Sequence, residues 1–156
     1  MSTRRTGSAP MPTGIAYLLG RLHRMLRRRM SEVLAPLGLT VQQYTMLAVL
    51  GARGQLSNAR LAERAFVTPQ TANEMVKAME TNDWIERSPH PSHGRVINLR
   101  LARRGQEILA RAHGAIAEVE SAMLGEVAAR DRQRFHDQLR SAIHALGMTM
   151  IDADNQ

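Results

Sequence analysis

The chain of 156 residues contains no cysteine. Without a thiol it can form neither a disulfide nor a cysteine-ligated zinc finger, and it can neither use a cysteine nucleophile nor sense redox state through one. Aromatic residues make up only 3% of the chain. Stacking of RNA or single-stranded DNA bases on exposed rings is therefore disfavoured, and the core is predicted to be aliphatic and rich in methionine.

Long apolar runs are missing as well. No run approaches the ~20 residues that a membrane-spanning helix needs, and the N-terminal segment with Arg4 and Arg5 lacks the apolar stretch of a secretory signal. The chain also has no glycine-rich phosphate loop, no nucleophile elbow and no paired-carboxylate motif. We therefore expect a cytoplasmic protein that has no membrane partner, is not an enzyme and needs no cofactor.

What the chain has in excess is positive charge. The net charge is +7 and the sequence pI is about 11.3, which indicates a polyanionic partner. Lys77 is the only lysine, so almost every cation is an arginine. Arginine is suited to bidentate contacts with phosphate and guanine, although a preference for arginine over lysine can equally reflect the base composition of a genome.

Apolar residues recur with helical spacing at both ends of a single predicted domain, residues 13–153. Residues 1–12 are polar and basic, and we expect them to form a disordered arm. In residues 13–36 the stripe consists of Ile15, Leu18, Leu19, Leu22, Leu26, Met30, Val33 and Leu34. Residues 103–151 end on a seam of Phe135, Leu139, Ile143, Leu146 and Met150. Neither stripe has a partner within its own segment, so each must pack against another helix.

The segment between them, residues 40–102, has the order of a winged helix-turn-helix. Thr40, Ser57 and Thr68 are favourable N-caps for three successive helices, and Pro69 fits the first position of the third. Residues 84–87 and 96–101 are typical of two strands, and a long basic loop separates them. The sequence therefore predicts a mostly α fold with a small β-hairpin wing, shaped to enter the grooves of duplex DNA.

The helix predicted from Thr68 to about residue 82 has two chemically different faces. At 100° per residue, the core-facing positions are Ala72, Met75, Val76 and Met79, and the opposite positions are Gln70, Asn73, Glu74, Lys77 and Thr81. The amides of Gln70 and Asn73 can bond adenine, the Glu74 carboxylate can accept from cytosine, and Lys77 suits phosphate or guanine. The alternative is an ordinary solvated face, but the position of the helix before a hairpin favours a role in reading DNA.

The predicted wing adds two arginines to this surface. Arg95 follows Gly94 in the loop and can reach a narrow minor groove. Arg87 at the base of the hairpin can take a phosphate or brace the wing by an ion pair, and the sequence does not separate these roles. The candidate DNA contacts are Thr68, Pro69, Gln70, Thr71, Asn73, Glu74, Lys77, Arg87, His93 and Arg95.

These residues resemble the MarR family, the multiple-antibiotic-resistance regulators. The likeness rests on residues 61–64 (LAER), 67–73 (VTPQTAN), 79–87 (METNDWIER) and 99–105 (LRLARRG), and the order of helices matches over roughly residues 14–150. The resemblance implies a homodimer whose dimerisation region is formed by residues 13–36 and 103–151, while residues 40–102 bind a palindromic operator. It also implies a transcriptional regulator, in most members a repressor, that is released by a small, often phenolic or anionic, ligand.

The sequence departs from the family pattern where it would meet DNA. Asp83 stands where the family usually has glycine, so Asn82 or Asp83 must tolerate a left-handed conformation. The wing reads His93–Arg95 without the usual aspartate, Ala102 replaces a capping threonine, and Glu74 would repel phosphates. The alternative function is therefore a dimeric winged-helix protein-interaction module that has lost DNA binding.

Two further groups of residues are candidates for other sites. A ligand pocket is suggested by Leu22, His23, Leu26 and Tyr44, although helix packing explains His23 and Tyr44 equally well. A metal site is suggested by His90, His93, Glu107 and His113. Solvated histidines explain this second group better, and no metal is expected.

Overall fold

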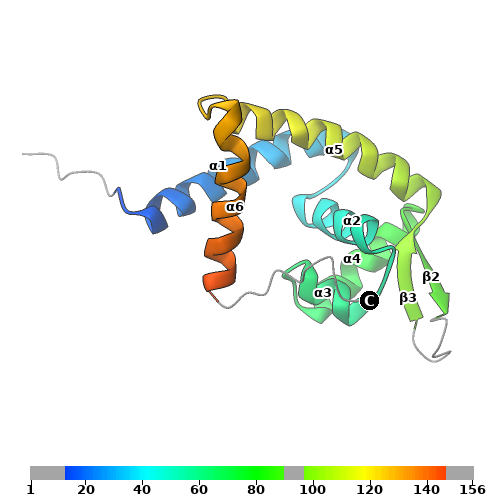
Figure 1. The fold of residues 1–156 in the computed structure, drawn as a ribbon. Coiled ribbons are helices and arrows are strands. Elements are labelled where there is room, and N and C mark those ends of the chain that lie inside the picture. Colours follow the sequence, from blue (N-terminus) through cyan, green and yellow to red (C-terminus); the bar gives the residue numbers. More distant parts are fainter. Residues whose placement is uncertain (1–12, 90–96, 147–156) are drawn as a thin grey trace, which may run out of the picture. The chain divides into compact units, whose positions relative to one another are not determined.

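The structure, a computed structural model, describes residues 13–89 and 97–146. The elements follow one another as α1 (Ile15–Leu34), the 3₁₀ turn η1 (Ala35–Leu37), α2 (Val41–Arg53), β1 (Gln55–Ser57), α3 (Asn58–Arg64), α4 (Pro69–Thr81), β2 (Ile85–Pro89), β3 (Ile97–Leu101), α5 (Arg103–Met123) and α6 (Ala129–Ala145) (Figure 1). This order confirms the predicted mostly α fold with a β wing. The expected arm at residues 1–12 and the end of the predicted helical seam at Met150 lie outside the described residues.

The chain divides into two compact units, Met1–Ile116 and Ala117–Gln156. The first contains every element from α1 to β3 together with the start of α5, and the second contains the end of α5 and all of α6. The winged helix-turn-helix therefore lies wholly within the first unit.

The sheet has one strand more than the sequence predicted. β3 lies in the middle and pairs antiparallel with β2 on one side and β1 on the other. In this register Leu56 stands opposite Leu99, and Glu86 stands opposite Arg100. The sequence analysis missed β1 because three residues are too few to show an alternating pattern.

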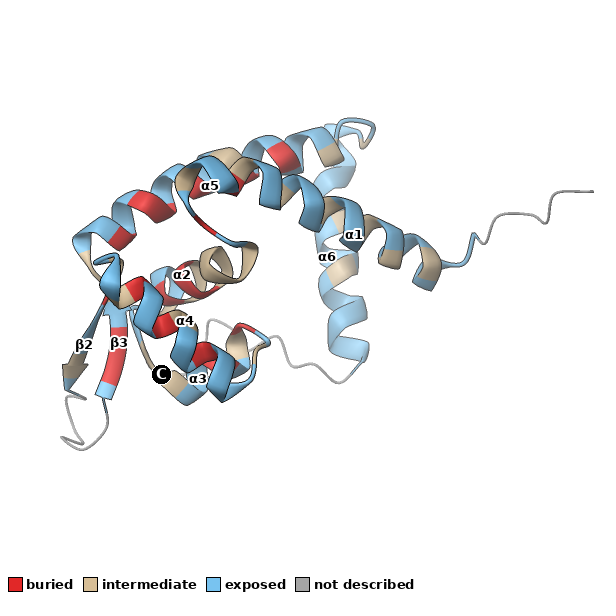
Figure 2. Cartoon of the chain, turned by 180° about the vertical axis from the view of Figure 1, so that it is seen from behind, coloured by how far each residue is buried: buried red, intermediate tan, exposed pale blue. Residues whose placement is uncertain are grey.

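The core of the first unit is aliphatic and rich in methionine, as predicted. Its largest fully buried side chains are Leu34, Met46, Leu47, Leu50, Leu61, Met79, Leu99 and Val76. Figure 2 shows such buried positions interleaved with exposed ones along α2, α4 and α5. This spacing fixes which face of α4 turns inward and which remains available to a partner.

Two helices keep most of their apolar residues accessible. Of the α1 residues only Leu34 is buried, and α6 has no buried residue at all. Exposed apolar side chains include Ile15, Leu18, Leu19 and Met25 on α1 and Ile143 on α6. The chain as described therefore leaves the predicted stripes without full cover, as expected of faces that need a further partner.

No single helix in residues 13–89 and 97–146 is long and apolar enough to cross a membrane. The segments Ile15–Leu37 and Val41–Arg53, bent by 82° at the break between them, pass the length and composition test only as a pair.

Candidate nucleic-acid interface

The start of α4 is fixed by the local chemistry that the sequence predicted. Thr68 is the N-cap, with extended backbone angles, and its hydroxyl oxygen accepts the backbone N–H of Thr71 at 3.1 Å. The two threonine hydroxyls also lie 2.9 Å apart. Pro69 occupies the first turn, where its missing N–H costs nothing. Because the N–H groups of Thr71 and Ala72 already bond to Thr68, the N–H of Gln70 is left in this turn to attract a phosphate.

The two faces of α4 are divided as the helical wheel predicted. Ala72, Val76 and Met79 are buried and Met75 is half-buried. The predicted outward positions are all exposed, namely Gln70, Asn73, Glu74, Lys77 and Thr81. The side chains proposed to read bases and phosphates thus form one solvent-facing surface.

The turn that leads into α4 contains a feature that the sequence analysis did not identify. α3 ends in a Schellman motif, in which the N–H of Phe66 bonds to the carbonyl of Glu63 and that of Val67 bonds to the carbonyl of Ala62. The motif requires a left-handed residue between helix and turn, and Phe66 supplies it with φ of 55°. Its ring is 74% exposed. The motif is usually marked by a glycine at this position, and because the sequence has phenylalanine there it carries no such signal.

The end of α4 has the same geometry and is tied to α5. Asp83 adopts φ of 57°, so of the two residues considered from the sequence it is Asp83 that takes the left-handed conformation. Its carboxylate accepts a bond from Arg104 at 3.1 Å. The next residue, Trp84, accepts the N–H of Ala102 through its carbonyl oxygen at 3.0 Å. These contacts join the end of α4 to the first turn of α5.

Gly105 closes this joint. It is buried, and a Cβ at this position would overlap the carbonyl oxygen of Trp84 and lie 2.8 Å from its carbonyl carbon. The backbone of α5 therefore approaches the backbone after α4 as closely as only glycine allows. The sequence analysis used Gly105 as part of the resemblance but gave no physical reason for it.

Arg87 on β2 is held by an ion pair. Its Nε and Nη2 atoms donate to the two carboxylate oxygens of Glu80 at 2.6 and 3.1 Å. On the same sheet, Arg100 lies 2.8 Å from Glu86. Of the two roles left open for Arg87, the geometry favours bracing of the wing against α4. The other two wing candidates, His93 and Arg95, lie outside the described residues.

A further basic group lies between α2 and α3. Arg64 is half-buried, and its Nε atom has no hydrogen-bond partner among the described residues. Burial lowers the pKa of the Arg64 guanidinium, and the nearby charges of Arg53 and Arg60 lower it further. The pKa of an arginine is high enough for the group to remain charged, so it adds to the positive potential of the unit.

The predicted ligand residues are only partly brought together. Tyr44 is half-buried on α2, and its ring meets the ring of His113 edge to face, with centroids 5.8 Å apart. On α1, Leu22 and Leu26 are half-buried and His23 is exposed. His113 is exposed, as predicted for a solvated histidine, and its ring contact with Tyr44 is a feature that the sequence did not indicate.

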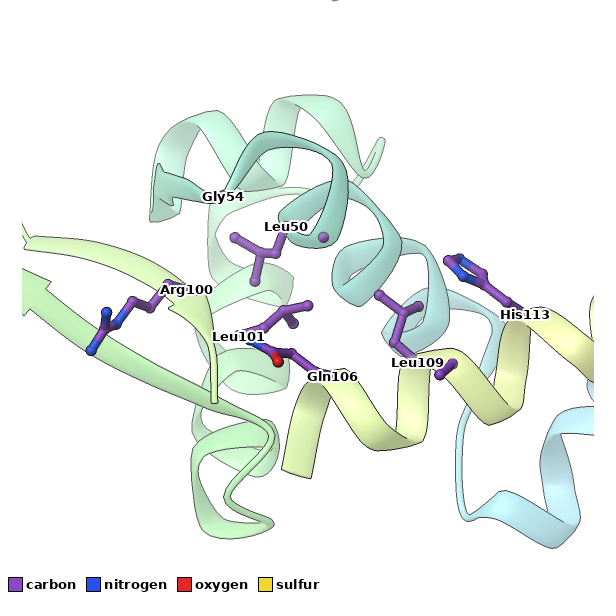
Figure 3. Close-up of a pocket in the computed structure, with 9 residues that line it drawn as sticks. Leu50, Gly54, Arg100, Leu101, Gln106, Leu109 and His113 are labelled. Atoms are coloured by element: carbon purple, nitrogen blue, oxygen red, sulfur yellow. The ribbon is translucent and has the colours of Figure 1, made fainter. Parts of the chain in front are cut away.

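A pocket of about 420 Å³ opens beside His113 in the first unit. It is lined by Leu50, Gly51, Gly54, Arg100, Leu101, Gln106, Leu109, Ala110 and His113, so it lies between the end of α2, β3 and the first half of α5. Figure 3 shows the Arg100 side chain extended away from Gln106 and Leu109. The four predicted ligand residues are not among those that line this pocket, and the sequence analysis missed the residues that do.

The described residues contain no group of three or more histidine and acidic side chains that could hold a metal ion. Of the histidines considered, His90 and His93 lie outside the described ranges. The structure therefore offers no support for a metal centre in the part of the chain that it describes.

Comparison with known proteins connects this geometry to a family. The sequence model of the MarR family matches residues 37–96. The chain is 32% identical over 125 residues to the HTH-type transcriptional repressor Rv2887 of Mycobacterium tuberculosis, a match that covers 80% of this chain and 90% of that protein. The structure is similar to that of the Mycobacterium tuberculosis MarR family protein Rv2887 in complex with salicylic acid, with a TM-score of 0.68, 30% identity and coverage of 88% of this chain and 99% of that chain. The structure is also similar to that of Rv2887 in complex with DNA, with a TM-score of 0.72, 28% identity and coverage of 84% of this chain and 98% of that chain.

Proposed function

The chain belongs to the MarR family of DNA-binding transcriptional regulators, and on that premise we propose that it is a homodimeric cytoplasmic repressor that binds a palindromic operator and is released by a small aromatic acid. In this proposal residues 40–102 bind DNA, residues 13–36 and 103–151 form the dimerisation region, and residues 1–12 form a basic arm. No catalytic role is assigned, because family members are regulators and not enzymes.

The observation that carries the proposal is the outward face of α4. Gln70, Asn73 and Lys77 are exposed together on a helix whose opposite face is buried. A helix held in this way can enter the major groove with its polar side chains directed at base edges. The Rv2887 structure with DNA has the same fold, and the net charge of +7 favours a phosphate backbone.

The first experiment measures binding of the full chain to DNA from upstream of its own coding sequence. Fluorescence anisotropy at several salt concentrations should show that the logarithm of the binding constant falls linearly with the logarithm of the salt concentration, with a slope of about −0.9 for each phosphate neutralised. Affinity that does not change with salt would contradict a phosphate-driven interface. Absence of binding to any genomic fragment would favour the alternative, a protein-interaction module that has lost DNA binding.

The second experiment separates base reading from backbone contact. Asn73→Ala and Gln70→Ala should reduce discrimination between operator and unrelated DNA, by about tenfold for each lost bidentate contact. Gln138→Ala removes the same kind of side chain from an exposed position on α6 and serves as the control. An equal loss of affinity on all sequences would reassign the two residues to the backbone.

The wing is tested in the same assay. Arg95→Ala should weaken binding most where A·T-rich sequence flanks the site, because a narrow minor groove has the most negative potential. An unchanged footprint would remove Arg95 from the interface.

The proposed dimer rests on the apolar face of α1. Leu18 is 52% exposed and Ile15 77% exposed on a helix that buries only Leu34. A second copy of the chain would cover such a face and gain about 25 cal/mol for each Å² removed from water. Leu18→Glu should shift the chain to a monomer in sedimentation experiments and weaken operator binding. The control is Arg24→Glu, at an exposed polar position of the same helix, which changes the charge without removing an apolar contact.

For the ligand we propose a small aromatic acid, with the pocket beside His113 as its site. The pocket volume lies in the range of about 300–1,000 Å³ that small-molecule sites occupy. Its lining combines apolar side chains such as Leu50 and Leu109 with the polar groups of Gln106 and His113. Leu22, His23, Leu26 and Tyr44 remain the predicted alternative.

Salicylate is the first probe, because Rv2887 has been solved with salicylic acid. Thermal shift and release from DNA should both respond to it, and His113→Ala should reduce the response more than His23→Ala. A response lost only in His23→Ala would favour the alternative residues. No response to a panel of aromatic acids would indicate a repressor without a ligand of this class.

A further inference from the structure

Phenylalanine is an unfavourable residue at position 66 for two reasons, its backbone conformation and its exposure. Its φ of 55° lies in the left-handed region, which is unfavourable for a residue that has a Cβ and is neither asparagine nor aspartate. Its ring is 74% exposed, so the fold gains little from burying it. Gly38 has the corresponding place after η1, with φ of 71°, and there the residue fits the backbone. Strain of this kind gathers at functional sites.

The position of Phe66 connects it to the recognition helix. It stands two residues before Thr68, the N-cap of α4, so their Cα atoms are at most about 8 Å apart. Pro69, the first residue of α4, is also exposed. Two exposed apolar residues, Phe66 and Pro69, thus lie at the leading end of the helix, a few residues from Gln70 and Asn73.

We propose that Phe66 contacts the operator and recognises thymine through its C5-methyl group, an inference that rests on the proposed DNA-binding function. The ring has no hydrogen bond to offer, so it complements neither a phosphate nor the donors and acceptors of the base edges. Thymine is distinguished in the major groove by a methyl group, and phenylalanine is among the side chains that contact it. The cost of a strained, exposed aromatic is then offset in the complex with DNA.

The test compares ordinary operator DNA with the same sequence in which deoxyuridine replaces every thymidine. The wild-type chain should bind the deoxyuridine form about fourfold more weakly for each methyl group in contact, the equivalent of about 0.8 kcal/mol. Phe66→Ala should bind thymine DNA more weakly than the wild type and should lose the preference for thymine. A variant that keeps the full preference, or a wild type that has none, would overturn the proposal. A wild type that binds no genomic DNA would instead refute the underlying function.

A second variant separates this role from a role in folding. Phe66→Gly relieves the left-handed strain, so its melting temperature should rise by about 2–4 °C while the preference for thymine disappears. Asp83→Gly is the matched control, because it relieves the same conformation at the other end of α4 and should leave the preference unchanged. A lower melting temperature for Phe66→Gly would show that the ring stabilises the fold and would overturn the proposal.

Discussion

Replacing Gly105 with alanine tests the close contact between the backbone after α4 and the first turn of α5. The added methyl carbon would overlap the carbonyl oxygen of Trp84 and lie 2.8 Å from the carbonyl carbon. Non-bonded carbons are most stable at about 3.5–4.0 Å, and the overlap with the oxygen is closer still, so the two backbone segments must separate by more than about 1 Å. Neither partner is a side chain that can rotate away, and the separation also weakens the bond from Ala102 to Trp84.

The magnitude follows from these two losses. Overpacking of a well-packed site costs about 1–3 kcal/mol, and a weakened backbone hydrogen bond adds about 1 kcal/mol. We therefore expect Gly105→Ala to lower the free energy of unfolding by about 3 kcal/mol. For a chain of this length the melting temperature should fall by about 6–12 °C.

Gly114 provides the control on the same helix. A Cβ there would meet nothing within 4 Å, so Gly114→Ala should raise the free energy of unfolding by about 0.5–1 kcal/mol through helix propensity alone. Urea titration of both variants, at equal protein concentration, should give shifts of opposite sign. If Gly105→Ala unfolds within about 0.5 kcal/mol of the wild type, the close approach of the two backbones is wrong.

Three further predictions concern side chains of the interface. Arg87→Ala and Glu80→Ala should each lower the free energy of unfolding by about 1 kcal/mol, and the double variant should lower it no further than either alone. If Arg87 instead contacts a phosphate, Arg87→Ala should reduce the slope of log affinity against log salt by about one. Glu74→Gln should strengthen binding to unrelated DNA by about threefold at low salt, whereas Glu118→Gln, the same charge change at an exposed position of α5, should not. Thr68→Ala should cost about 1 kcal/mol in urea titration by removing the cap of α4, and an unchanged midpoint would contradict its capping role.

What the sequence predicted best are features that depend on residues close together in the chain. Thr40, Ser57 and Thr68 accept N–H groups from residues three positions later, so each cap can be recognised within one turn of helix. The inward and outward faces of α4 likewise follow from a period of 3.6 residues. Such local regularities do not require knowledge of the fold.

What could not be predicted depends on distant parts of the chain. β1 exists because Leu56 meets Leu99 across the sheet, and no pattern within three residues indicates that pairing. The pocket combines Leu50 with Gln106 and His113, residues whose proximity follows only from the packing of α2 on α5. From the sequence, Arg87 can either contact a phosphate or brace the wing. Only the direction of β2 relative to α4 brings it to Glu80 and favours the ion pair.

Helix ends lie between these two cases, and they explain why Phe66 was missed. After η1, α3 and α4 the same pair of backbone bonds closes the helix, and the residue between them is Gly38, Phe66 or Asp83. The bonds to the last carbonyls require a left-handed residue whatever its side chain. In a sequence the motif is recognised by a glycine, or by an aspartate that tolerates the left-handed conformation. It is therefore not recognised where a phenylalanine adopts that conformation despite its unfavourable energy. That failure is informative, because residues that neither local preference nor burial favours are expected at functional or strained sites.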